Sequence, residues 1–342
     1  MIPIFDGHND TITRADAADF ATGRAGGHID LPRARAGGLA GAIFALFQST
    51  PGYDADFGEA EAGGAYALAL AEPIGQDVAA AGATRAAGRL LALERAGHVR
   101  IARRPEDLDE ALADGVLAAV MHLEGAEAID AELEALDLWH AAGLRSLGPV
   151  WSRANAFAHG VPFAFPASPD TGPGLTEAGA ALVRRCARLG IAVDVSHLNE
   201  AGFWDVARID AAPLIASHSG VHALSANTRN LTDAQIDAVG SSDGLIGIVF
   251  AVAFLREDGR NDVATPLATL AAHIRHVADR IGVEHVAFGS DFDGADVPTE
   301  LGDATGLPRL LDALADAGFS AAEVRAIAWE NWRRVLGRAW GG

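Results

Sequence analysis

Residues 191–219 read IAVDVSHLNEAGFWDVARIDAAPLIASHS, and this stretch carries the pattern on which the fold assignment depends. Two short apolar runs, 191–196 and 213–217, flank an amphipathic stretch at 199–208. Short runs rich in β-branched residues predict buried strands, and a helical stretch between two of them predicts a βαβ unit with parallel strands. A histidine, His197 or His218, lies at the end of each run. The stretch therefore predicts a parallel sheet with polar residues at its carboxyl edge.

The same alternation runs through the whole chain of 342 residues. We expect about eight strands, at 2–6, 40–47, 116–123, 145–150, 191–196, 213–217, 244–250 and 285–290. Helices are expected at 63–97, 105–114, 131–142, 175–189, 199–208, 232–239, 266–281, 306–317 and 320–338. Several of these helices have capping residues at their start, namely Thr176, Asn199, Thr232 and Ser320.

Eight strands with interleaved helices favour a (β/α)8 TIM-type barrel of the α/β class over an open doubly wound sheet. The Gly-rich phosphate fingerprint of many doubly wound folds does not follow the first expected strand. The Pro/Gly-rich stretch 160–174 is interpreted as a long loop rather than a domain linker. We therefore expect one hydrolase domain spanning residues 1–342.

The composition narrows the classes of function. The chain has 26 Lys+Arg against 46 Asp+Glu and a formal net charge of −20, so nucleic acids and anionic membranes are poor partners. Every basic residue is arginine, which excludes Schiff-base chemistry, a P-loop lysine and a carbamylated lysine between metals. The single cysteine, Cys186, excludes an internal disulfide and metal sites built from several cysteines. The start, MIPIFDGHND, has no basic leader pattern, and we expect a cytoplasmic protein.

Residue types that bind metals gather where the expected strands end. In a barrel, functional groups lie at the carboxyl ends of the strands. Histidine and carboxylate ligands suit zinc or a similar divalent ion. A carboxylate at the end of a buried strand also needs a charge partner, and the chain has no lysine to supply one. The sequence therefore predicts a metal centre built from His8, Asp10, Glu124, His197 and His218, with Asp291 close by.

Two arrangements of this centre remain open at this point. Glu124 is the natural bridge between two ions about 3.5–4 Å apart, which together activate one water. Alternatively, a single ion is held by the other four residues, and Glu124 is only their neighbour.

Six segments with metal-binding or charged residues follow one another along the chain. They are Asp6-Gly7-His8-Asn9-Asp10, His122-Leu123-Glu124-Gly125, Asp194-Val195-Ser196-His197, Ser217-His218-Ser219, Thr228-Arg229-Asn230-Leu231 and Gly289-Ser290-Asp291-Phe292-Asp293-Gly294. In this order they resemble the membrane dipeptidase (renal dipeptidase) family, which consists of binuclear zinc peptidases with an amidohydrolase-like barrel, and the resemblance spans nearly the whole chain.

The resemblance implies two Zn²⁺ ions per chain and a role for each site residue. His8 and Asp10 would hold one ion, His197 and His218 the other, and Glu124 would bridge them. Asp291 corresponds to the acid/base that handles the proton, and Arg229 to the clamp on the C-terminal carboxylate of the substrate. The implied reaction is hydrolysis of a dipeptide by a metal-bridging hydroxide, with tolerance for a D-residue at the C-terminal position as an open option.

One position departs from the family pattern. Where the family often has a substrate-contacting histidine after the fourth strand, this chain has Trp151. An indole cannot make the imidazole contact to a developing oxyanion, so Arg153 or Asn155 would have to compensate. We expect Trp151 and Asn155 to contact the substrate.

The sequence thus predicts a zinc-dependent metallo-dipeptidase with a dipeptide as its small-molecule partner. The first alternative is another metal-dependent amidohydrolase, acting on a carboxylate-bearing amide or a lactone. The second is a non-catalytic binding protein, against which the intact ligand set argues. A homodimer is left open.

Overall fold

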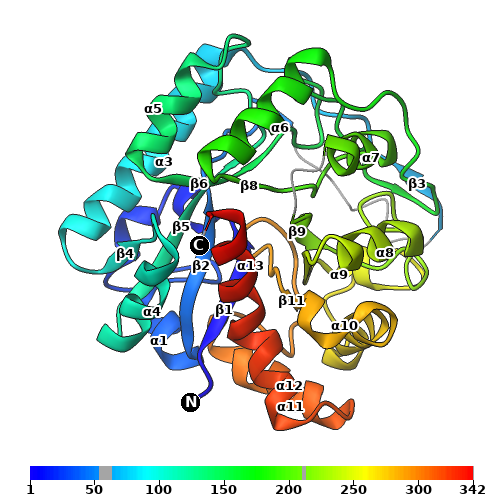
Figure 1. The fold of residues 1–342 in the computed structure, drawn as a ribbon. Helices are drawn as coiled ribbons and strands as arrows, with labels where there is room; N and C mark the ends of the chain where they lie inside the picture. The colour runs from blue at the N-terminus through cyan, green and yellow to red at the C-terminus, as the bar shows by residue number, and fades with distance from the viewer. Residues whose placement is uncertain (54–63, 210–212, 342) are drawn as a thin grey trace.

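The computed structural model describes residues 1–53, 64–209 and 213–341 (Figure 1). Eight parallel strands form the wall of a barrel, in an order around the barrel that follows the chain. The strands are β1 (Ile4–Asn9), β2 (Leu39–Ala45), β5 (Leu117–Glu124), β6 (Leu144–Gly148), β8 (Ala192–Val193), β9 (Ile215–Ser219), β10 (Leu245–Ile248) and β11 (Val286–Phe288).

The wall closes on itself at two places. Asp6 of β1 pairs with Phe288 of β11, so the last strand returns to the first. Beyond β8, the backbone N–H of Val195 donates to the carbonyl of Ile215 at 2.8 Å, which joins β8 to β9. These contacts, together with the parallel register of the other pairs, confirm the predicted (β/α)8 barrel.

Helices cover the outside of the barrel and one of its ends (Figure 1). They are α1 (Leu31–Gly37), α3 (Gln76–Arg95), α4 (Pro105–Asp114), α5 (Glu134–Ala142), α6 (Glu177–Leu189), α7 (Glu200–Ile209), α8 (Asp233–Ser241), α9 (Val252–Leu255), α10 (Leu267–Ile281), α11 (Leu307–Asp316), α12 (Ala321–Arg325) and α13 (Asn331–Ala339). The four predicted capping residues are confirmed, because the side chains of Thr176, Asn199, Thr232 and Ser320 each accept a hydrogen bond from the first turn of their helix.

The expected helix at 63–97 is wrong at its start. Position 63 lies outside the described residues, β3 (Tyr66–Ala67) is extended, and α3 begins only at Gln76. Pro73 lacks a backbone N–H, and Gly75 has extended backbone, which together delay the helix. β3 pairs antiparallel with β7 (Ala164–Phe165) from the expected long loop at 160–174, and a further short strand, β4 (Val99–Ile101), extends the sheet beside β5.

Helix α13 covers the amino-terminal end of the barrel, and we call this cover, with Trp332 at its centre, the seal. Trp332 of α13 is fully buried and donates its indole N–H to the carbonyl of Phe288 at 2.8 Å. A Cβ atom at Gly7 of β1 would lie 2.3 Å from Trp332 Cζ2 and 2.6 Å from the carbonyl oxygen of Ser217. Only glycine therefore lets β1 pack directly on this seal.

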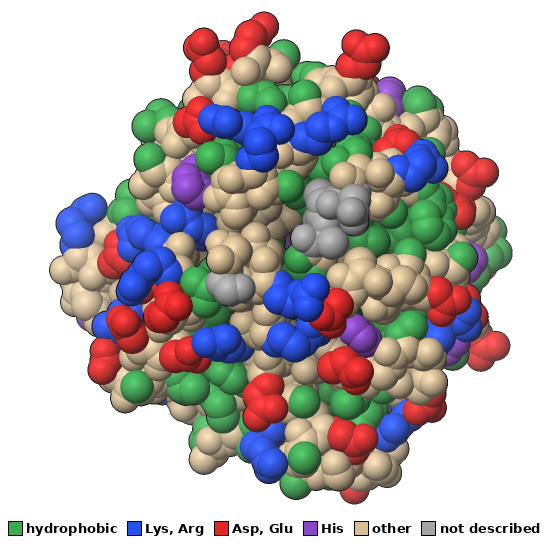
Figure 2. All heavy atoms as spheres, viewed as in Figure 1, with side chains coloured by type: hydrophobic (Ala, Val, Ile, Leu, Met, Phe, Trp, Pro, Cys, Tyr) green, Lys and Arg blue, Asp and Glu red, His purple; other side chains and the backbone are tan. Residues whose placement is uncertain are grey.

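Charged side chains of both signs are interspersed on the face that includes α13 (Figure 2). Two arginines of α13 pair with acidic groups of other elements: Arg333 lies 2.7 Å from Asp109, and Arg338 pairs with Asp243. None of the described helices combines the length and the apolar character needed to cross a membrane.

The close contact at Gly7 yields a prediction about stability. Gly7→Ala is expected to lower the free energy of unfolding by about 2–3 kcal/mol, because the added methyl group overlaps backbone as well as the indole. Gly88→Ala, in the exposed part of α3 where a Cβ meets nothing within 4 Å, is the matched control. It should raise that free energy by about 0.5–1 kcal/mol. Urea unfolding of both variants measures the difference, and equal effects would contradict the packing argument.

Candidate active site

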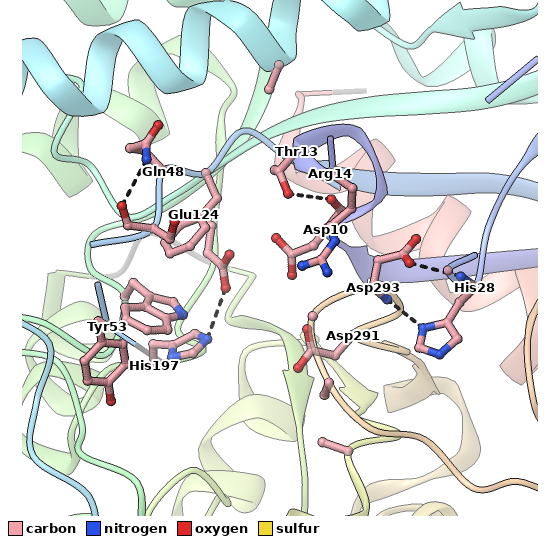
Figure 3. Close-up of a pocket in the computed structure, with 18 of the residues that line it drawn as sticks. Asp10, Thr13, Arg14, His28, Gln48, Tyr53, Glu124, His197, Asp291 and Asp293 are labelled. Atoms are coloured by element: carbon pink, nitrogen blue, oxygen red, sulfur yellow. Dashed lines mark hydrogen bonds and ion pairs between the residues drawn. The ribbon is translucent and has the colours of Figure 1, made fainter. Parts of the chain in front are cut away.

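A cavity of about 840 Å³ opens at the carboxyl ends of the strands, where the predicted site residues lie (Figure 3). Five of those residues are in its wall: Asp10, Glu124, Trp151, His197 and Asp291. They come from five different strand ends or the loops that follow them. The barrel therefore brings together side chains that are far apart in the sequence.

Three imidazoles converge on one carboxylate oxygen. Glu124 Oε1 lies 3.1 Å from His197 Nε2, 3.5 Å from His8 Nε2 and 3.6 Å from His218 Nε2. The Nε2 atoms of His197 and His218 are 3.0 Å apart, and His8 Nε2 lies 3.8 Å from Asp10 Oδ2. Glu124 belongs to two groups of potential ligand atoms, one with His8 and Asp10 and the other with His197 and His218. Within each group, all the ligand atoms lie within 4.8 Å of one another. This is the grouping expected for a bridging carboxylate.

Asp291 belongs to the same cluster. Its carboxylate lies within 4.8 Å of ligand atoms of His8 and His218, on the side where its loop faces Asp10 (Figure 3). The backbone N–H of Asp291 donates to the carbonyl of His8 at 3.0 Å, which ties the loop after β11 to β1. Asp291 can therefore reach the same reacting atoms as the histidines.

Hydrogen bonds from serines fix the orientation of two imidazoles. Ser217 Oγ lies 2.5 Å from Asp194 Oδ2 and 2.7 Å from His218 Nδ1. Because a carboxylate only accepts, Ser217 donates to Asp194 and receives the Nδ1 proton of His218. Ser152 Oγ lies 2.8 Å from Nδ1 of His197. Both contacts orient Nε2 of the imidazole toward Glu124, and the bond at His218 leaves its Nε2 lone pair free to bind a cation.

His8 provides the clearest test of whether the residues fit a metal. Its ring is completely buried, yet neither ring nitrogen has a hydrogen-bond partner among the described residues. Buried polar atoms are nearly always satisfied, so an unpartnered imidazole facing two carboxylates is expected where a cation binds. The donor set of imidazole nitrogen and carboxylate oxygen fits zinc and similar divalent ions.

Burial without a compensating cation perturbs the protonation of these groups. Burial raises the pKa of Glu124 well above its usual range and that of Asp291 to about 7. Burial lowers the pKa of His8, but the nearby carboxylates outweigh it and raise that pKa to about 10. The pKa values of His197 and His218 fall well below the usual range, first because of burial. The binding of a divalent ion by such groups is therefore coupled to the release of protons.

Two site residues have a strained backbone. His197 has a φ of 64° and Asp291 a φ of 58°, in the left-handed region that non-glycine residues seldom adopt. Such conformations persist where the surrounding structure holds them, and they cluster at functional sites. Here they turn the side chains at two strand ends inward to the cluster.

Arg229 lies beside the cluster but not among the residues that line the cavity. It is 3% exposed, donates to the carbonyl of His218 at 3.0 Å, and has its guanidinium carbon 5.7 Å from the Phe254 ring. Its Nε has no partner among the described residues. Burial lowers the pKa of Arg229 to about 10, and the charges of Asp291 and Glu124 oppose that shift.

The β3–β7 ribbon holds the segment that carries Arg229. Asn227 donates to the hydroxyl of Tyr66 at 2.8 Å, and the backbone of Thr228 donates to Ala164 at 3.1 Å. Sequence patterns did not predict this ribbon, so they could not show how Arg229 is positioned.

Trp151 forms part of an aromatic wall of the cavity. Its ring lies 5.1 Å from Phe47, 5.9 Å from Phe163 and 5.8 Å from the imidazole of His197. The guanidinium carbon of Arg153 lies 5.5 Å from the same indole. Trp151 thus lies in the cavity wall beside His197, and its contact with a substrate remains a prediction.

Asn155 and Arg153 are not in the cavity wall. The Asn155 side chain donates to the carbonyl of Pro149 and accepts from the backbone of Phe157 and Ala158, and it borders a separate surface groove. Arg153 is 2.8 Å from Glu127. The expectation that Asn155 contacts the substrate therefore has no support in the structure, because the loop uses its amide to stabilise its own turn.

The sequence patterns did not indicate the two orienting serines. The adjacency of Ser217 to the predicted ligand His218 is a usable signal, since such a hydroxyl lies within reach of Nδ1. No such signal exists for Ser152, which is 45 residues from His197 and meets it only through the fold.

Comparisons with known proteins identify the family of the chain. The family model described as membrane dipeptidase (peptidase family M19) matches residues 1–340. A metallo peptidase from Rhodobacter sphaeroides, solved with a phosphinate mimic of the dipeptide L-Ala-D-Ala, is 47% identical with a TM-score of 0.96, and the match covers 99% of each chain.

Two curated proteins extend the comparison. An uncharacterized protein in the pqqA 5′ region of Klebsiella pneumoniae is 47% identical over 245 residues, which is 72% of this chain and 90% of that protein. Dipeptidase tcpJ of Claviceps purpurea is 28% identical over 341 residues, which is 97% of this chain and 76% of that protein. The resemblance noted in the sequence is confirmed, and the chain belongs to the membrane dipeptidase family, peptidase family M19, as a hydrolase that acts on peptide bonds.

Proposed function

We propose that this chain hydrolyses dipeptides at a centre of two zinc ions held by His8, Asp10, Glu124, His197 and His218. The observation that carries the proposal is the sharing of Glu124 by two groups of ligand atoms. A single ion would not need two separate donor groups around one carboxylate. The dipeptidase names of the relatives support the substrate class.

The proposed roles follow from where each group lies. Bound zinc ions would supply Lewis acidity and a water of lowered pKa. Asp291, next to His8 and His218, takes the proton of the attacking water and delivers it to the nitrogen of the leaving amine. Arg229, whose Nε has no partner among the described residues, lies on the β9 side and orients the C-terminal carboxylate of the substrate. Trp151 and its aromatic neighbours exclude water from the scissile bond.

Tolerance for a D-residue at the C-terminal position is part of the proposal. It is supported by the Rhodobacter sphaeroides relative, whose bound phosphinate mimics L-Ala-D-Ala. The tryptophan at 151 favours, as a second candidate, another carboxylate-bearing amide or a lactone, because no imidazole stands at that point of the wall. We also propose that residues 1–342 act as one domain. A cytoplasmic location and a homodimer stay predictions.

Metal content distinguishes the bridge from the acid/base. Glu124→Gln should lower zinc occupancy more than Asp291→Asn, since only the bridge serves both ions. Elemental analysis after zinc supplementation measures the occupancy of both variants and of the unmodified protein. The reverse order would mean that the two roles are exchanged, and only trace metal in the unmodified protein would overturn the centre itself.

Proton transfer predicts the kinetic effect at Asp291. Asp291→Asn should lower kcat by roughly 10²–10⁴-fold while zinc stays largely bound, because an amide cannot carry the proton. Steady-state kinetics on a dipeptide, with metal content measured in parallel, separate chemistry from metal loss. Near-normal turnover would assign the proton to another group.

The carboxylate clamp is tested by a double-mutant cycle. Arg229→Ala and a C-terminally amidated dipeptide are the two single changes. Each should lower kcat/KM, because the first removes the guanidinium and the second removes the carboxylate of the proposed buried pair. If Arg229 holds the carboxylate, the combined loss is much smaller than the product of the two fold-losses. Losses that multiply would show that Arg229 does not touch that group, and urea unfolding checks that the variant is folded.

A further inference from the structure

One side of the cavity carries arginines that the proposed reaction does not use. Arg14, Arg85 and Arg89 all line the cavity. Arg14 follows β1, while Arg85 and Arg89 belong to α3, so the three side chains come from neighbouring parts of the barrel. Arg14 extends into the same space as Asp10 and Asp291 (Figure 3). We call these three residues the arginine side of the cavity.

Arg89 has a different task from the other two. Its Nη1 donates to the carbonyl of Ile12 at 2.7 Å and to the carbonyl of Arg14 at 3.0 Å. It therefore fastens the segment that carries Arg14 against α3. Arg89 is a positioning residue, and the guanidinium groups of Arg14 and Arg85 are the ones available to a ligand.

Among the residues that the structure describes, no carboxylate lies within 4.0 Å of the guanidinium groups of Arg14 and Arg85. Asp16, the acidic group whose pKa Arg14 helps to lower, is itself bound to Arg24 at 2.8 Å. Asp293 of the cavity wall is held by Arg24 at 2.6 Å, and Asp296 accepts from Asn261 at 2.7 Å. The described carboxylates of this wall that lie outside the metal cluster thus have other partners, and none of them neutralises the arginine side.

The order of the strands places this side opposite Arg229. Arg85 follows β2, Arg229 follows β9, and these two strands are four steps apart in either direction around the eight-stranded wall. The metal ligands lie between the two. A dipeptide whose C-terminal carboxylate faces Arg229 and whose scissile carbonyl faces the ligands must direct its N-terminal residue toward the arginine side.

We propose that Arg14 and Arg85 make the enzyme prefer dipeptides with an acidic side chain, Asp or Glu, on the N-terminal residue. This inference rests on the proposed dipeptidase function and specifies its substrate class. A chain of net charge −20 repels anions in general, so two neighbouring guanidinium groups without a carboxylate partner among the described residues are the feature that would let an acidic substrate enter. An ion pair between an arginine near solvent and an acidic substrate side chain raises the binding affinity by about a few-fold for each arginine, and salt weakens it.

The test compares Glu-Ala with Gln-Ala, which are nearly the same size and differ in one charge. Each dipeptide is prepared with L-Ala and with D-Ala, and the measured quantity is the ratio of kcat/KM for the Glu dipeptide to that for the Gln dipeptide. The unmodified enzyme should favour Glu by about fivefold to tenfold at low salt, and the double variant Arg14→Gln/Arg85→Gln should bring the ratio to about one.

Arg95→Gln is the matched control, since Arg95 is an exposed arginine of the same helix α3 that does not line the cavity. It should leave the ratio unchanged. Arg85→Glu should push the ratio below one, because the introduced carboxylate repels the acidic side chain. Urea unfolding confirms that each exposed substitution leaves the fold intact.

The outcomes distinguish a failure of the arginine-side inference from a failure of the proposed dipeptidase function. Hydrolysis of both dipeptides with the same ratio in the unmodified enzyme, the double variant and the control overturns the arginine-side inference and leaves the dipeptidase proposal standing. A ratio of one or less in the unmodified enzyme does the same. If the zinc-loaded enzyme hydrolyses none of the dipeptides, the proposed function fails and this inference fails with it.

Discussion

The site depends on the cost of burying the carboxylate of Glu124. A carboxylate removed from water needs a cation or several donors, and the chain has no lysine to offer. The barrel instead surrounds Glu124 Oε1 with three imidazole nitrogens at 3.1–3.6 Å. Burial lowers the pKa values of two of these imidazoles, His197 and His218, so neither cancels the charge, whereas divalent ions would. The strand ends, the orienting serines and the strained backbone at His197 all serve this one requirement.

Hydrophobic periodicity and capping residues predicted the strands and most of the helices of the barrel. All eight barrel strands lie where the apolar runs place them, because a strand buried in a barrel needs a continuous apolar run and tolerates little else. The start of α3 was not predictable from helical periodicity alone, since the stretch before Gln76 has helix-forming composition, yet part of it pairs with β7 far along the chain. Long-range pairing of this kind leaves no local pattern.

In the candidate site, too, some residues could be placed from local sequence patterns and others could not. His8, Asp10, Glu124, His197 and His218 follow predicted strands directly, so the fold class alone brings them together. Residues on loops are harder to place, because a loop can direct its side chains to itself. Asn155 shows this, since its amide binds three backbone groups of its own loop. Ser152 shows the converse, because it reaches His197 only after the loop has folded over β8.

The seal formed by Trp332 beneath Gly7 links the two ends of the chain. The first strand carries His8 and Asp10, but it packs on an indole far along the sequence and pairs with β11, which also lies far along the sequence. A chain without α13 therefore has His8 and Asp10 without the packing that fixes the position of their strand. A change at Trp332 consequently acts, through β1, on the cluster of imidazoles and carboxylates at the opposite end of the barrel.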